Sequence, residues 1–248
     1  MQLSLSSARR ISLAAAAMTL SAATVLAAET PSIQTELFEK PHVTDLAAGT
    51  KLTYNFVRNG SEPKLIGPNF ENVIEVDIDK ANEDASRDVT VQIFRGELER
   101  DPRKITGVTA NPVLVFFLDR AISGFQLLAG GSGSYHKNRF RLALRTEGGL
   151  SPIKIDYNGK QVDGYKLSVR PFTGDRKFLD KMKGYENAQF DFVMSDNVPG
   201  YFAAFKSHYS SPKEGSPSLD ESIVLEGVKV PESGAKSADD TKSSGETK

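Results

Sequence analysis

The chain contains no cysteine and no tryptophan among its 248 residues. The absence of cysteine excludes disulfide bonds, thiolate catalysis, cysteine-ligated zinc, iron–sulfur clusters and an N-terminal lipid on cysteine. The chain also lacks an excess of charge of one sign, because its formal net charge is −1 at pH 7. This balance gives no electrostatic reason to expect nucleic acid as a partner.

Motifs for catalysis and metal binding are also missing. The histidines, His42, His136 and His208, have no second histidine or carboxylate at the spacing typical of a zinc site. The sequence contains no Gly-x-Ser-x-Gly elbow, no Walker motif and no Rossmann glycine fingerprint. We therefore expect no metal, no cofactor and a non-enzymatic function. A hydrolase is the disfavoured alternative, because no nucleophile–base pair can be assembled from the sequence.

Residues 1–27 have the pattern of a secretory signal peptide. Arg9 and Arg10 precede the uncharged, alanine-rich stretch 11–26, and Val25 and Ala27 occupy the −3 and −1 positions of a cleavage site. The alternative is a membrane anchor, because an uncharged stretch of this length approaches a membrane span. The pattern predicts cleavage after Ala27 and export to a bacterial periplasm, with no transmembrane segment in the mature chain.

The mature chain divides into a single folded domain, residues 28–230, and a tail, residues 231–248. In the domain, apolar and polar residues alternate, as in Leu52-Thr53-Tyr54-Asn55-Phe56, which is typical of antiparallel strands with one buried face. Asn158-Gly159 predicts a type I′ turn in a hairpin. The tail contains no aromatic and no large aliphatic residue, so we expect it to be disordered.

Two helices are expected in the middle of the domain. Asn111-Pro112 begins an apolar stretch that Gly130-Gly131 ends, which indicates a helix over residues 113–129. A second helix is expected over residues 137–145, with Phe140, Leu142 and Leu144 facing inward. Together with about eight or nine strands, these helices predict an α+β fold: a curved antiparallel sheet, or half-barrel, with two central helices packed against it.

Two groups of residues are candidate binding sites. The first group forms an apolar face that can hold an acyl chain, with ordinary core packing as the alternative. Its members are Tyr54, Phe56, Phe116, Phe117 and Phe125. The second group follows a glycine-rich loop, where helix N-terminal amides and basic side chains favour an anion such as a phosphate or carboxylate. Its members are His136, Lys137, Arg139 and Arg141, and the alternative is a solvated basic face paired with carboxylates.

Several short segments carry a resemblance to a known family. They are Leu37-Phe38, Leu52-Thr53-Tyr54, Asn111-Pro112 with the apolar helix after it, residues 139–144, and Ser195-Asp196-Asn197-Val198-Pro199-Gly200. Together they resemble an exported family of Gram-negative bacteria without an assigned activity. Over residues 36–230, the element order is similar to that of the lipoprotein-carrier half-barrels of the LolA/LolB type. That resemblance implies a non-enzymatic carrier of lipids or acylated proteins and transfers no functional residue.

Two functions are compatible with these patterns. The first is a periplasmic, non-enzymatic binding protein for a hydrophobic or amphipathic ligand, such as a lipid or an acylated protein, that serves the cell envelope. The second is an envelope interaction or scaffold protein, whose sheet is filled by its own helix and which has no small-molecule ligand. An envelope protein would then be the partner.

Overall fold

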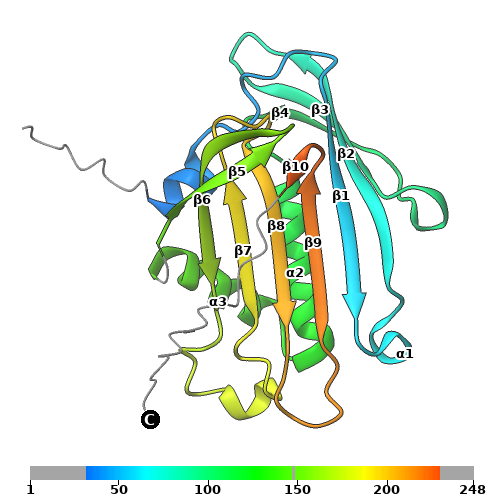
Figure 1. Cartoon of the computed structure of the whole chain (residues 1–248), viewed down its shortest axis with the longest axis vertical. Helices are drawn as coiled ribbons and strands as arrows, with labels where there is room; N and C mark the ends of the chain where they lie inside the picture. Colours follow the sequence, from blue (N-terminus) through cyan, green and yellow to red (C-terminus); the bar gives the residue numbers. More distant parts are fainter. Residues whose placement is uncertain (1–31, 147–148, 230–248) are drawn as a thin grey trace, which may run out of the picture. The chain divides into compact units, whose positions relative to one another are not determined.

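The computed structural model describes residues 32–146 and 149–229, which form one antiparallel sheet with associated helices (Figure 1). The predicted signal peptide (1–27) and tail (231–248) lie outside the described residues. The helices are α1 (Pro63–Ile66), α2 (Val113–Ala129) and α3 (Gly133–Thr146), with the short helical turns η1 (Thr35–Glu39), η2 (Gly96–Leu98) and η3 (Leu179–Met182). The strands are β1 (Lys51–Gly60), β2 (Phe70–Ala81), β3 (Arg87–Ile93), β4 (Arg103–Val108), β5 (Ser151–Tyr157), β6 (Lys160–Val169), β7 (Gln189–Met194), β8 (Phe202–Tyr209), β9 (Leu219–Leu225) and β10 (Val228–Lys229).

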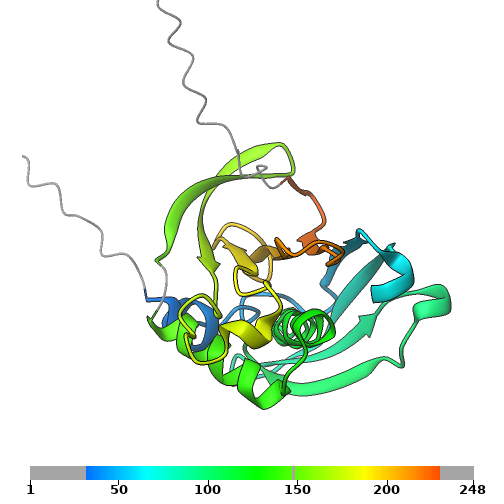
Figure 2. The ribbon, with the colours of Figure 1, turned by 90° about the horizontal axis from the view of Figure 1, so that it is seen from below.

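The sheet has ten strands in the order β10-β5-β6-β7-β8-β9-β1-β2-β3-β4. Strand β9 lies between β8 and β1. It therefore joins strands β1–β4, which precede α2 and α3 in the sequence, to strands β5–β8, which follow these two helices. The strands curve around α2, which is seen end-on against the concave face of the sheet in Figure 2. The predicted α+β class, a curved antiparallel sheet with helices packed against it, is therefore confirmed.

The strand predictions are confirmed where hydrophobic residues alternate. In the predicted hairpin, Asn158 and Gly159 have φ angles of 51° and 78°, as a type I′ turn requires. Strand β4 was not predicted because almost all of its residues are exposed, so it has no alternating pattern. At the end of the described chain, β9 stops at Leu225 and the short β10 pairs with β5.

Helix α2 has the predicted bounds. Asn111 Oδ1 accepts a hydrogen bond from the Val113 amide at 3.1 Å, and the chain leaves the helix at Gly130 with a φ of 82°. The helix approaches β8 closely at Gly124, where a Cβ atom would lie 2.7 Å from Tyr209 Oη. That hydroxyl donates a hydrogen bond to the Ala121 carbonyl oxygen at 2.9 Å. No described helix is both long enough and apolar enough to cross a lipid bilayer.

Helix α3 differs from the prediction in its start and in one buried residue. It begins at Gly133 rather than Lys137, and Phe140 and Leu144 are buried as expected. Leu142, however, is 45% exposed, so the prediction that it faces inward was wrong. Residues four apart share a helix face, whereas a residue two positions along lies on nearly the opposite side.

A cluster of charged side chains lies on the buried face of the sheet, where the alternating pattern of β1 and β9 predicts apolar residues. Arg58 on β1 is the register partner of Glu221 on β9, and the two side chains form an ion pair. Arg120 from α2 forms a second ion pair with the same carboxylate. Arg58 and Glu221 are only 6% and 4% exposed. Through these ion pairs the cluster connects α2 to β1 and β9, the strands at which the two halves of the sheet meet.

Candidate functional site

The five residues predicted to hold an acyl chain lie in the core or at its edge. Tyr54, Phe56, Phe117 and Phe125 are fully buried, and Phe116 is partly buried. Tyr54 Oη accepts a hydrogen bond from Asn111 Nδ2 at 2.8 Å. The structure thus places these side chains in the core-packing arrangement that was the alternative interpretation. Their role in ligand binding stays a prediction.

The aromatic rings on the concave face pack directly against one another. The Phe117 ring stacks on Phe205 with 4.9 Å between centroids and meets the edge of Phe192 at 5.2 Å. The Phe125 ring stacks on Phe172 at 3.7 Å. Helix α2 therefore packs against β7 and β8 through Phe117, and against the segment after β6 through Phe125.

The four residues predicted to bind an anion do not form one site. His136 is 2% exposed, and its Nε2 donates to the Gly130 carbonyl oxygen at 2.8 Å. Burial lowers the pKa of the His136 imidazole, which favours its neutral form at pH 7. Arg139 donates to the Pro171 carbonyl oxygen at 3.0 and 2.7 Å and lies 3.7 Å from the Asp175 carboxylate.

Lys137 and Arg141, the other two predicted residues, share one face of α3 because they are four residues apart. Arg145 extends the same row by one further turn. All three side chains line a groove between α2 and α3. The groove is therefore lined by two of the four residues predicted to bind an anion, Lys137 and Arg141, and by one further basic residue, Arg145.

The floor of this α2–α3 groove is apolar. Its volume is about 680 Å³, and Gln34 and Phe38 from the η1 region line it together with the two helices. The apolar lining residues of the helices are Val115, Leu118, Ile122, Phe140 and Leu144. Val115 is 62% exposed and Phe38 is 50% exposed. An exposed apolar surface of this kind, rimmed by polar residues, is typical of a binding site.

The charges on the groove rim are mostly positive. Asp119 on α2 faces the row from the other helix and lies 3.6 Å from Lys137 Nζ. Arg141 donates to Asn138 Oδ1 at 3.2 Å. Three basic side chains against one carboxylate leave the rim with a net positive charge, so the groove is suited to an amphipathic molecule with an anionic end.

Sequence reasoning did not select Phe38, Val115 or Arg145 for this site. The four-residue spacing of Lys137, Arg141 and Arg145 is a signal in the sequence, because it predicts that the three basic side chains share one face of a helix. The floor was harder to find, because apolar residues surround almost the whole circumference of α2. Residues 32–146 and 149–229 contain no group of three or more histidine, aspartate or glutamate side chains that could hold a metal ion.

Comparisons with known proteins show only distant similarity. No protein-family model and no curated protein matches the chain. A solved structure of a DUF1329 family protein from Desulfovibrio piger is 12% identical, with a TM-score of 0.25 over 76% of this chain and 88% of that chain. A LolA superfamily protein from Nitrosomonas europaea is 7% identical, with a TM-score of 0.19 over 82% of this chain and 95% of that chain. The resemblance to an exported Gram-negative family is not confirmed by these similarities.

Proposed function

We propose that the protein binds an amphipathic lipid with an anionic head group in the α2–α3 groove, and that it does so without catalysis. The observation that carries this proposal is the apolar floor next to the row formed by Lys137, Arg141 and Arg145. An acyl chain on the floor would remove apolar surface from water. A phosphate or carboxylate head group would accept charge-assisted hydrogen bonds from the row.

The size of the groove agrees with this ligand class. Its volume of about 680 Å³ falls within the range of roughly 300–1,000 Å³ that ligand pockets usually occupy. The signal-peptide pattern of residues 1–27 supports the periplasm as the location. The proposed role is that of a periplasmic binding protein that serves the cell envelope.

Val115→Glu tests the apolar floor. We expect this variant to bind lysophosphatidylglycerol at least about tenfold more weakly, because a carboxylate on the floor opposes both the acyl chain and the anionic head group. Isothermal titration calorimetry below the micelle concentration measures the affinity. The matched control is Leu127→Glu, which makes the same charge on α2 at a residue that is 51% exposed and does not line the groove. Equal affinities for Val115→Glu and the parent protein would contradict the proposed site.

Arg141→Gln tests the basic row. The parent protein is expected to prefer anionic lysophosphatidylglycerol over zwitterionic lysophosphatidylcholine, and Arg141→Gln to reduce this preference about threefold to tenfold. The effect is moderate because water and salt screen a charge on an exposed rim. Lys104→Gln is the control, because it removes an exposed positive charge from β4. A preference that is absent in the parent, or unchanged in Arg141→Gln, would refute the role of the row.

A partner protein is the second candidate occupant of the groove. The exposed apolar side chains of Phe38 and Val115 offer surface that the apolar face of a partner helix can cover. A parent protein that binds neither lysolipid, but loses an envelope partner when Val115 is replaced by Glu, would favour this function over lipid binding.

A further inference from the structure

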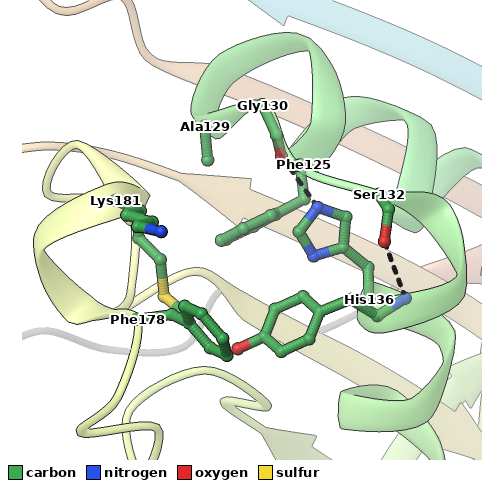
Figure 3. Close-up of a pocket in the computed structure, with 10 residues that line it drawn as sticks. Phe125, Ala129, Gly130, Ser132, His136, Phe178 and Lys181 are labelled. Carbon is green, nitrogen blue, oxygen red and sulfur yellow. Dashed lines mark hydrogen bonds between the residues drawn. The ribbon is translucent and has the colours of Figure 1, made fainter.

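A second cavity lies where the end of α2, the start of α3 and η3 meet (Figure 3). Its volume is about 340 Å³, and it shares no lining residue with the α2–α3 groove. Its lining includes the apolar side chains of Phe125, Ala129, Phe178 and Met182 and the polar aromatic side chains of Tyr135 and His136. This volume is at the lower end of the range of roughly 300–1,000 Å³ for ligand pockets, so the cavity suits a small molecule.

Two polar atoms of side chains that line this cavity are buried and lack a hydrogen-bond partner among the described residues. They are Tyr135 Oη and His136 Nδ1. A polar atom that is buried without a partner destabilises the fold, and native structures contain few of them. Both atoms belong to residues that line one cavity, which points to a ligand at this place.

The tautomer of His136 follows from its other nitrogen. Nε2 lies 2.8 Å from the Gly130 carbonyl oxygen, the contact drawn as a dashed line in Figure 3. A carbonyl oxygen only accepts hydrogen bonds, so Nε2 carries the proton and Nδ1 of the neutral ring is an acceptor. The residues that line the cavity thus carry an unused acceptor, together with a phenol hydroxyl that can donate or accept.

The remaining walls of the cavity are mainly apolar and aromatic. The Tyr135 and Phe178 rings meet edge to face at 5.2 Å, and His136 meets Phe125 in the same way at 4.9 Å. Lys181 lies on the opposite side of the cavity from His136 in Figure 3. Its Nζ is 5.4 Å from the centre of the Phe178 ring. Such walls favour a flat or compact apolar body over a strongly hydrated one.

We propose that this cavity binds a small, uncharged, mainly apolar molecule that carries a hydroxyl group, of the size of an aromatic or alicyclic alcohol or a phenol. The hydroxyl group donates to His136 Nδ1 and accepts from Tyr135 Oη, while the apolar body packs among Phe125, Phe178 and Met182. This site is independent of the lipid groove.

Titration with 2-naphthol tests the proposal. Because the chain contains no tryptophan, the fluorescence of the probe can be excited without a contribution from indole. The comparison probe is 2-methoxynaphthalene, which has the same two rings but no hydrogen to donate. We expect the parent protein to bind 2-naphthol about tenfold more tightly than the methoxy compound, as the satisfaction of a buried acceptor predicts.

Two cavity variants separate the hydrogen bonds from the packing. Tyr135→Phe removes only the unpartnered Oη, and we expect it to weaken 2-naphthol binding at least about threefold. His136→Phe keeps a ring of similar size, and we expect it to abolish the preference for 2-naphthol while the methoxy compound still binds. Tyr157→Phe on β5 is the control for the first variant, because Tyr157 does not line the cavity.

Val115→Glu distinguishes this site from the groove. We expect this variant to bind 2-naphthol as the parent protein does, even where it has lost lysophosphatidylglycerol. Failure of both naphthalene probes to bind, equal affinity for the two probes in the parent protein, or loss of 2-naphthol binding in Val115→Glu would each overturn the proposal.

Discussion

Glu221→Gln is expected to lower the free energy of unfolding by about 3–5 kcal/mol, the usual effect of removing one partner from a buried ion pair. Glu221 is the carboxylate that both Arg58 and Arg120 contact, and Arg120 Nε lies 3.3 Å from Glu221 Oε2. Glutamine keeps the size of the side chain but removes its charge. The Arg58 cation would then remain buried without the anion that compensates it.

Chemical denaturation with urea measures this change. The matched variant combines Arg58→Met with Glu221→Leu, which removes both buried charges together and is expected to recover most of the lost stability. Lys154→Gln is the surface control, because Lys154 pairs with Asp163 and both side chains are mainly exposed. A Glu221→Gln protein as stable as its parent would show that the cluster does not hold β1, β9 and α2 together.

Phe117→Ala is expected to lower the free energy of unfolding by about 3–5 kcal/mol, which is typical of truncating a buried phenylalanine. Phe117 is 2% exposed, and it contacts the rings of Phe192 and Phe205. The loss combines the transfer of the ring from water to the core with the cavity that the truncation leaves.

Val115→Ala is the control for this second experiment, because Val115 lies two residues earlier on α2 and is largely exposed. Its effect is expected to stay within about 0.5 kcal/mol. A Phe117→Ala protein that unfolds at the same denaturant concentration as its parent would contradict the contribution of this ring to the core.

Much of the fold could be predicted because its signals are local. Alternation identifies strands that have one buried face, as in β1, and Asn158-Gly159 marks a turn through its own backbone preference. Strand β4 has neither signal. The alternation of Phe140, Leu142 and Leu144 with basic residues wrongly predicts that Leu142 faces inward, because side chains on a helix repeat every 3.6 residues and not every two.

The candidate sites were less predictable because they depend on contacts between distant segments. Lys137 and Arg141 were identified from their charge, but the groove exists only where α2, α3 and the η1 region meet. The pairing of Arg58 with Glu221 depends on the register of β1 against β9. A single sequence contains no local pattern that specifies this register.

The position of β9 also has a consequence for the order in which the chain folds. Strands β1–β4 pair with their neighbours in sequence, and so do β5–β8, so each group can form from local contacts. The two groups are connected in the sheet only when β9 inserts between β8 and β1. Pairings between segments so far apart form slowly.

Until that insertion, β1 and β8 each present an open edge that can pair with another chain. We expect a chain that stops before Leu219 to collapse into two partial sheets and to aggregate through these edges. Strand β9 therefore completes the sheet. The chain is most prone to aggregation during folding in the interval before β9 pairs with β8 and β1.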